Sequence, residues 1–169
     1  DTYLNSNINN SKISLHLRND RNFAGRIKFQ SIRILDQEGV EIQSAILGKK
    51  TIFEVFLNCL REVDRVGIRL LFTNKKGQIL FLCNNAFSSN RFNVVSDTQI
   101  QCTIPKLPLP EGNYSIRLSA FSDNGTEDDI ENALNFQVTA GDFYQTGKVP
   151  LSRDGVLVDH YFKIKGHDF

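Results

Sequence analysis

Apolar and polar residues alternate with a period close to two through almost the whole chain from Gly25 onward. Successive side chains of a strand point to opposite faces, so this period predicts strands with one buried face. No window carries a convincing helical stripe, and the chain is therefore predicted to be all-β. The rows expected to face the core are Phe53, Val55, Leu57 and Cys59; Ile68, Leu70 and Phe72; Ile100, Cys102 and Ile104; Tyr114, Ile116, Leu118 and Ala120; and Leu134, Phe136 and Val138.

About seven or eight such strands, separated by turn signals, predict a two-sheet β-sandwich of immunoglobulin-like or jelly-roll type. In immunoglobulin-like order, the third, fourth, sixth and seventh core strands share one sheet. The alternation slips by one residue at Gln30–Ser31, which predicts a β-bulge. The segment 74–77 ends in Gly77 and predicts a tight hairpin turn. The acidic segment 127–131, with Asp128 and Asp129, is expected to be solvated and to form a single helical turn.

The length of 169 residues suits one domain. Residues 1–24, rich in Asn and Ser, are interpreted as a linker that ends in a short edge strand, and residues 25–169 as the sandwich. The formal net charge of +1 gives no field to steer a polyanion, which argues against nucleic acid as a partner. No apolar run approaches the roughly 18 residues of a membrane span, and the chain begins with polar residues and no Met. We therefore expect a soluble piece of a longer chain.

Cys59, Cys83 and Cys102 are odd in number and widely spaced, which suits neither a disulfide framework nor a zinc site. Reduced thiols in a cytoplasmic protein are the simplest interpretation. His16, His160 and His167 are scattered and belong to no metal or nucleophile motif. We expect no catalytic residues, no metal site and no cofactor.

The C-terminal end predicts a strand that pairs outside its own sheet. The connection 141–150 is too long for a hairpin, whose loops usually run about two to five residues. The following segment, about 155–164, is apolar on both faces, with Val156, Val158 and Ile164 on one face and Leu157 and Tyr161 on the other. Such a strand is covered on both sides, either on a distant edge of its own domain or on a partner subunit. We predict a homodimer in which this strand is exchanged.

The outward rows of the strands offer the best candidates for a binding site. A sugar presents C–H faces ringed by hydroxyls, so an aromatic ring beside planar donors and amides suits it. The alternative interpretation of such a row is an ordinary solvated sheet face. The predicted carbohydrate-binding residues are Arg69, Phe81, Arg117, Ser119, Phe121, Asn135 and Gln137, with Cys83 in the same outward row. The other sheet offers a second candidate face with Glu54, Phe56, Asn58, Gln99, Gln101 and Thr103.

Several motifs occur in the order found in one family. "G-R-I" at Gly25 leads to "S-I-R-I-L-D", "L-P-E-G-N-Y-S-I" begins at Leu109, and "E-N-A-L-N-F-Q-V", "G-D-F-Y-Q-T-G-K" and "G-V-L-V-D-H-Y" close the chain. This order, from about Gly25 to Ile164, resembles the C-terminal domain of Wzt. Wzt is the nucleotide-binding subunit of bacterial ABC transporters that export O-antigen polysaccharide.

The resemblance implies a non-catalytic domain that recognises the finished, often capped end of an undecaprenyl-linked O-polysaccharide in the cytoplasm. It also implies an upstream ATPase domain, a transporter membrane subunit as partner, and a homodimer formed by exchange of the C-terminal strand. Two alternatives remain open at this point. One is a structural dimerisation module of the transporter that binds no glycan. The other is a secreted adhesin or carbohydrate-binding β-sandwich.

Overall fold

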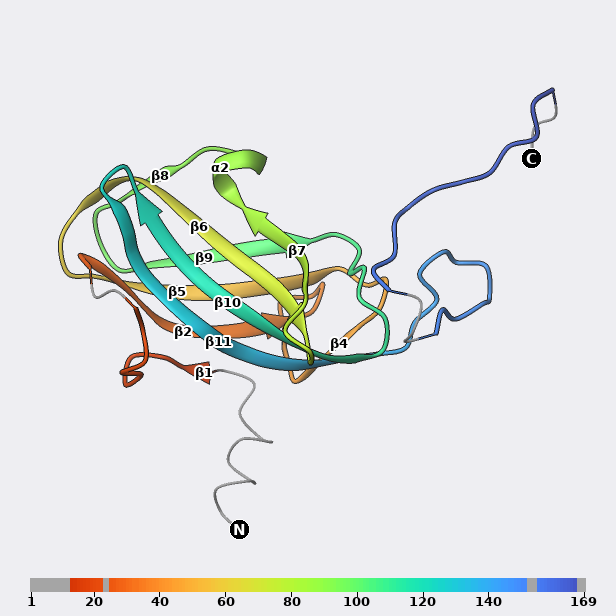
Figure 1. The fold of residues 1–169 in the computed structure, drawn as a ribbon, viewed down its shortest axis with the longest axis horizontal. Coiled ribbons are helices and arrows are strands. Elements are labelled where there is room, and N and C mark those ends of the chain that lie inside the picture. Colours follow the sequence, from red (N-terminus) through yellow and green to blue (C-terminus); the bar gives the residue numbers. More distant parts are fainter. Residues whose placement is uncertain (1–12, 23–24, 152–154, 167–169) are drawn as a thin grey trace, which may run out of the picture.

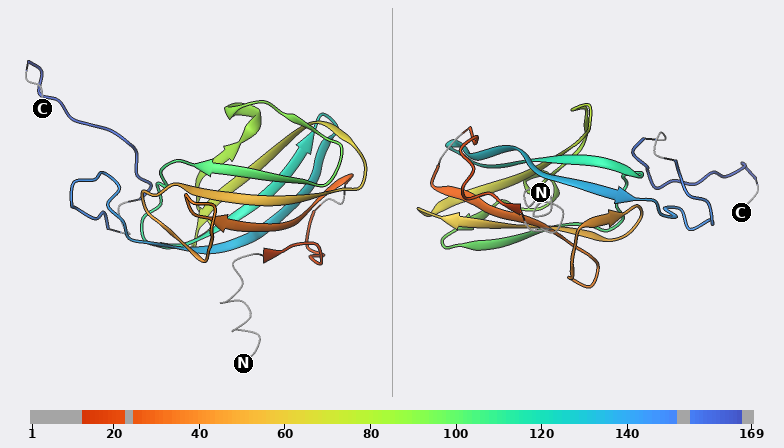
Figure 2. Two further views of the ribbon diagram at one scale, coloured as in Figure 1. Left: turned by 180° about the vertical axis from the view of Figure 1, so that it is seen from behind. Right: turned by 90° about the horizontal axis from the view of Figure 1, so that it is seen from below.

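Two curled β-sheets pack face to face in the computed structural model, which describes residues 13–22, 25–151 and 155–166 (Figure 1). The first sheet has the strand order β1-β2-β5-β9, with β3 paired to β2; the second has the order β4-β11-β10-β6-β7, with β8 paired to β6. Figure 2 shows the two layers from two further directions. The strands of the first sheet are β1 (Ile13–Ser14), β2 (Ile27–Leu35), β3 (Glu41–Ile42), β5 (Thr51–Cys59) and β9 (Thr98–Ile104). Those of the second are β4 (Ser44–Ile46), β6 (Val63–Asn74), β7 (Ile79–Asn84), β8 (Phe92–Val94), β10 (Gly112–Ser122) and β11 (Gly125–Thr139). A short helix, α2 (Asn85–Ser88), follows β7.

Aromatic side chains from both sheets meet in the core. The Phe53 ring lies 5.2 Å from that of Phe72 and 5.5 Å from that of Phe136, centroid to centroid, in edge-to-face geometry. All five rows expected to face the core do so, although the β9 row is only partly buried because β9 is an edge strand. The all-β sandwich predicted from the alternation is thus confirmed.

Two local predictions are also confirmed. The pairing of β2 with β5 shifts by one residue between Phe29 and Ser31, at the expected bulge. The turn between β6 and β7 is closed by the Asn74 side chain, whose Oδ1 accepts hydrogen bonds from the backbone N–H groups of Lys76 (2.9 Å) and Gln78 (3.0 Å). Gly77 has φ +77°, which favours glycine at this position.

The predicted helical turn at 127–131 is wrong. This segment lies inside the long strand β11, and Asp128 is fully buried rather than solvated. The Asp128 carboxylate accepts from the Arg21 guanidinium (3.1 Å) and from the Phe29 backbone N–H (2.9 Å). Because partners from other parts of the chain neutralise the charge, local propensity does not decide the structure here.

Residues 13–22, which we call the N-terminal strap, pack as part of the sandwich. Ile13–Ser14 forms the edge strand β1, and Leu15 is completely buried in the core. The Arg21 guanidinium also donates to the backbone carbonyls of Leu15 (2.5 Å) and Phe29 (3.3 Å). The strap therefore covers the edge of the sandwich between β2 and β11.

Residues 155–166, which we call the C-terminal arm, belong to neither sheet and extend away from the sandwich (Figure 1). Two contacts hold the base of the arm against the sandwich. The Leu157 N–H donates to the Pro108 carbonyl at 2.9 Å, and Lys106 Nζ donates to Asp159 Oδ1 at 3.3 Å. Farther out, Tyr161 is 87% exposed and Phe162 is 84% exposed. Strand exchange with a second copy stays a prediction.

The three cysteines are free and half-buried. Cys83 was expected to point outward, but it packs against the core and lines the same hollow as Cys102, between the edge strands β7 and β9. The contact with Cys102 lowers the pKa of Cys83, whereas the same contact and burial raise the pKa of Cys102.

Thiol alkylation of the native protein should therefore be slow and ordered. Because the thiolate is the reactive form, iodoacetamide should label Cys83 before Cys102, and both should react much faster in guanidinium. Mass spectrometry of the peptides measures the rates. Labelling of Cys102 at equal rates with and without guanidinium would contradict the burial of this row.

The buried Arg21–Asp128 pair predicts a large asymmetry between single and double substitutions. Arg21→Met strands a buried carboxylate, and its cost should be about 3–5 kcal/mol of unfolding free energy. The cost should shrink as the pH falls, since burial already raises the pKa of Asp128 and protonation removes the stranded charge.

Urea unfolding measures both effects. The double variant Arg21→Met, Asp128→Asn should recover part of the loss, because neither charge is then left alone. Arg65→Met is the control, since the Arg65–Asp123 pair is exposed and should shift the midpoint little. Additive losses in the double variant would contradict the pairing.

Candidate functional site

The outer face of the second sheet carries a continuous strip of polar side chains along β10. The register places Asn113 opposite Gln137, Ser115 opposite Asn135, and Ser119 between Arg69 and Asp129. From residue 113 to residue 121 the strip extends over roughly 26 Å, at about 3.3 Å per residue. We call this surface the β10 strip.

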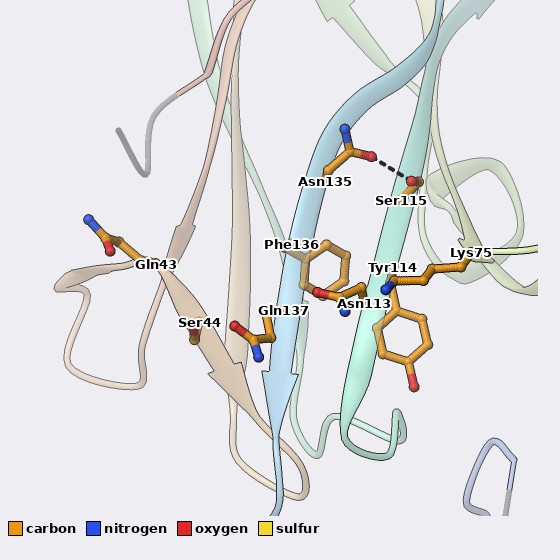
Figure 3. Close-up of a pocket in the computed structure, with 9 residues that line it drawn as sticks. All are labelled: Gln43, Ser44, Lys75, Asn113, Tyr114, Ser115, Asn135, Phe136 and Gln137. Atoms are coloured by element: carbon orange, nitrogen blue, oxygen red, sulfur yellow. Dashed lines mark hydrogen bonds between the residues drawn. The ribbon is translucent and has the colours of Figure 1, made fainter. Parts of the chain in front are cut away.

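One end of the β10 strip forms an open groove of about 560 Å³ (Figure 3). Its only charged side chain is that of Lys75. The Ser115 hydroxyl donates to Asn135 Oδ1 at 2.6 Å, which fixes the orientation of that amide. The groove is lined by Gln43, Ser44, Lys75, Asn113, Tyr114, Ser115, Asn135, Phe136 and Gln137. Amides and hydroxyls on a rigid sheet offer both donors and acceptors to a neutral polar ligand.

The other end forms a narrower hollow of about 240 Å³, lined by Arg69, Leu71, Arg117, Ser119, Phe121, Thr126 and Asp129. The Arg117 guanidinium binds Asp129 in a fork, with Nε 2.9 Å from Oδ1 and Nη2 2.5 Å from Oδ2. Ser119 Oγ donates to the same carboxylate at 2.9 Å. Arg117 is the main cause that holds the pKa of Asp129 below its usual value, so this carboxylate stays charged.

An aromatic ring and two further arginines complete the narrow hollow. The Phe121 ring lies under the guanidinium of Arg69 (5.1 Å) and that of Arg91 (5.6 Å). The ring occupies the space above Gly67, where an added Cβ would meet it at 2.1 Å. Among the described residues, no carboxylate forms a salt bridge with Arg69.

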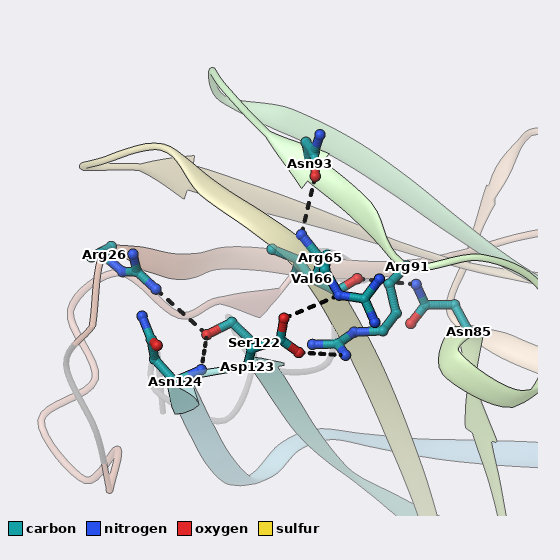
Figure 4. A network of polar contacts seen from close by, with 9 residues as sticks. All are labelled: Arg26, Arg65, Val66, Asn85, Arg91, Asn93, Ser122, Asp123 and Asn124. Carbon is teal, nitrogen blue, oxygen red and sulfur yellow. Dashed lines mark hydrogen bonds and ion pairs between the residues drawn. The ribbon is translucent and has the colours of Figure 1, made fainter.

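A polar network closes this end of the β10 strip (Figure 4). The Asp123 carboxylate forms salt bridges with Arg91 Nη1 (2.8 Å) and Arg65 Nε (3.0 Å). The salt bridge with Arg91 connects the loop after α2 to the tip of the β10–β11 hairpin. The Arg65 backbone N–H donates to Asn93 Oδ1 at 3.1 Å, and Arg65 has φ +56°, which is rare for a non-glycine residue. The network holds Arg91 in place beside the Phe121 ring.

The structure brings six of the seven predicted site residues onto this face. Arg69, Arg117, Ser119 and Phe121 line the narrow hollow, while Asn135 and Gln137 line the open groove. Phe81 is the exception, because its ring stacks on Phe72 at 4.4 Å on the core side. The pairing of β6 with β7 shifts by one residue, with Thr73 opposite Ile79 but Phe72 opposite Phe81. This irregularity reverses the phase of β7, which the sequence pattern did not reveal.

Several residues of the face were missed. Asn113 could have been found, since it alternates with Tyr114, whose side chain is inward. Ser44 reaches the open groove because the short strand β4 pairs in parallel with the end of β11. No local sequence pattern predicts this pairing. Asp129 was assigned to a solvated turn, although its side chain is only 8% exposed.

On the second candidate face, which lies on the first sheet, several polar side chains hydrogen-bond to one another. Arg33 Nε donates to Glu54 at 2.7 Å, and Gln101 Nε2 donates to the same carboxylate at 2.8 Å. A hollow of about 310 Å³ remains around Phe56 and Gln99. It lacks an arginine, so the mixture of groups sought for a sugar site is more complete on the second sheet.

Within residues 13–22, 25–151 and 155–166, no group of His, Cys, Asp or Glu side chains is arranged to hold a metal ion. In the same part of the chain, no helix has the length and apolar character needed to span a membrane. The class that the fold and the surface define is a β-sandwich domain with a polar sheet face suited to binding.

Comparison with known proteins identifies the family. The profile described as the Wzt C-terminal domain matches residues 18–151. A solved structure described as "Crystal structure of the C-terminal domain of wzt" superposes with a TM-score of 0.66 at 17% identity, covering 85% of this chain and 90% of that one. A search of curated protein sequences finds no match. The chain belongs to the Wzt C-terminal domain family, which supports a role in the ABC transporter of O-antigen polysaccharide.

Proposed function

We propose that this domain recognises the end of a lipid-linked O-antigen polysaccharide along the β10 strip. The observation that carries the proposal is that the open groove and the arginine-lined hollow lie one after the other along β10, on the same face of one sheet. The groove supplies hydroxyl and amide partners for neutral sugar units, and the hollow supplies an arginine beside an aromatic ring.

The closed end of the strip favours a chain terminus over an internal segment. Arg91 and the Asp123 network occupy the region beyond Phe121, so a polysaccharide lying along β10 would have to end there. The open end has no comparable barrier among the described residues, and the growing remainder of the polymer would leave past Lys75 and Gln137.

In this proposal the recognition step takes place in the cytoplasm, and membership of the Wzt C-terminal domain family supports this location. In this proposal an ATPase domain of the parent protein lies upstream of the sandwich and works with the membrane subunit of the transporter. The sandwich itself performs no chemistry. It selects finished glycan for export.

The C-terminal arm supports a homodimer as a further part of the proposal. The arm is extended and presents exposed apolar side chains, including Val158 (68%) and Ile164 (60%). Addition to a sheet edge of a second copy would satisfy its backbone groups and cover these side chains. This arm also favours the alternative of a structural dimerisation module.

Alanine substitution in the open groove should weaken glycan binding without unfolding the domain. Asn135→Ala or Gln137→Ala removes an exposed amide, and each should lower affinity by about two- to ten-fold, the equivalent of a neutral hydrogen bond. Calorimetry with O-polysaccharide from the encoding bacterium measures the effect. Arg69→Gln should cost more, about ten- to a hundred-fold, if its guanidinium contacts the glycan.

Phe56→Ala, on the opposite sheet, is the matched control. If it loses binding while the groove variants bind like the wild type, the site lies on the first sheet. Arg117→Ala is a poorer probe, because it would leave the buried Asp129 carboxylate without its cation. Absence of binding by the wild-type protein at any concentration would favour the dimerisation module.

Removal of residues 154–169 should convert the dimer to a monomer, as measured by light scattering. If the truncated protein is insoluble, the full-length double variant Phe162→Asp, Ile164→Asp offers a second test. It keeps the chain length but places charges on the apolar arm, and it should shift the equilibrium toward monomer. A stable dimer in both cases would rule out exchange of the arm.

A further inference from the structure

The N-terminal strap is hydrogen-bonded to β11 at Asp129, a residue that lines the narrow hollow. The Asn22 backbone N–H donates to the Asp129 carbonyl at 3.0 Å. The Arg18 guanidinium donates to the carbonyls of Glu131 (3.0 Å) and Asn132 (3.4 Å). The strap therefore follows the same stretch of β11 that supplies the wall of the hollow.

The Asp129 carboxylate contacts the strap and also lines the narrow hollow. Asp129 Oδ2 accepts from Asn22 Nδ2 at 3.2 Å and from Arg117 Nη2 at 2.5 Å. Asp129 Oδ1 accepts from Arg117 Nε and from Ser119 Oγ, both at 2.9 Å. Four donors use the roughly four lone-pair positions of a carboxylate, so the acceptor capacity is filled. Loss of one donor must therefore change the strength of the hydrogen bonds that the carboxylate accepts from the other donors.

The strand geometry makes this sharing specific to Arg117. The pairing of β10 with β11 is interrupted between Ile116 and Leu118, and Asn132 on the opposite strand has φ +49°. Arg117 thus lies opposite a bulge. Its guanidinium extends to Asp129, and its second contact with a carboxylate is the longer one to Glu131, at 3.7 Å.

We propose that Asp129 is a positioning residue that couples the N-terminal strap to the narrow hollow, so that strap docking and ligand binding reinforce each other. The ligand part rests on the function proposed above. A hydroxyl or anionic group that accepts from Arg117 competes with Asp129 for the guanidinium. The Asp129 carboxylate then accepts stronger hydrogen bonds from Asn22 and Ser119, and the stronger bond to Asn22 holds the strap more firmly against β11.

The coupling is reciprocal, as linkage requires. When Asn22 is released, Asp129 binds the Arg117 guanidinium more strongly. Arg117 then donates weaker hydrogen bonds to the ligand. Since the strap joins the sandwich to the residues before Ile13, occupancy of the hollow is transmitted to the N-terminal side of the domain.

A double-substitution cycle tests the shared carboxylate without any ligand. Arg117→Lys keeps the charge but loses the fork, and Asn22→Ala removes the strap amide. Because the two donors compete for one carboxylate, Asn22→Ala should lower the urea midpoint more in the Arg117→Lys background than in the wild type. Asn19→Ala is the matched control, the same change at an exposed strap position. Equal effects of Asn22→Ala in both backgrounds would overturn the coupling.

Titration with O-polysaccharide from the encoding bacterium tests the ligand arm. Asn22→Ala should weaken binding about two- to ten-fold while Asn19→Ala binds like the wild type. Amide exchange in residues 13–22 should slow when glycan is bound. Wild-type affinity in Asn22→Ala, or unchanged exchange, would overturn the proposal. If the wild type binds no glycan, the proposed function fails, and the ligand-free cycle alone decides whether Asp129 couples strap and hollow.

Discussion

Three consecutive acidic residues in β11, each buried and each paired with an arginine from a different segment, fix how the neighbouring segments are arranged around this strand. Glu127 pairs with Arg26 (2.8 Å), Asp128 with Arg21 (3.1 Å) and Asp129 with Arg117 (2.5 Å). Buried carboxylates are costly unless they are paired and hydrogen-bonded, so these contacts fix the partners rather than add much net stability. Because Arg21 and Arg26 flank the junction of strap and β2, the acidic triplet locks the N-terminal edge onto the second sheet.

The same triplet organises the outer face of the second sheet, where the proposed site lies. Asp129 neutralises Arg117, whereas Arg69 keeps its charge above the Phe121 ring. The β10 strip is therefore graded, from a nearly neutral groove at Gln137 to an arginine-rich end at Phe121. A polymer of sugars with a distinct terminal group would match such a gradient, since hydroxyls suit amides and a cap with acceptor oxygens suits guanidinium groups.

Close backbone contact explains one sequence motif at the start of the domain. The Gly25 N–H donates to the Glu127 carbonyl at 2.8 Å, and a Cβ at Gly25 would come within 2.5 Å of that oxygen. The glycine of the "G-R-I" motif thus permits the approach, and the next residue, Arg26, supplies the cation for Glu127. Backbone and charge therefore position the beginning of β2 together.

The sequence by itself determined the all-β class, the inward rows, the bulge at Gln30–Ser31 and six of the seven side chains on the outer face of the second sheet, because a period of two is a local property of the chain. Only the tertiary structure decided the conformation of Asp128 and Asp129, whose burial depends on arginines up to about a hundred residues away. It also decided the inward phase of Phe81 through a one-residue shift between β6 and β7, and the contribution of Ser44 through a parallel pairing. Register and charge pairing arise between distant segments, and no local pattern encodes them.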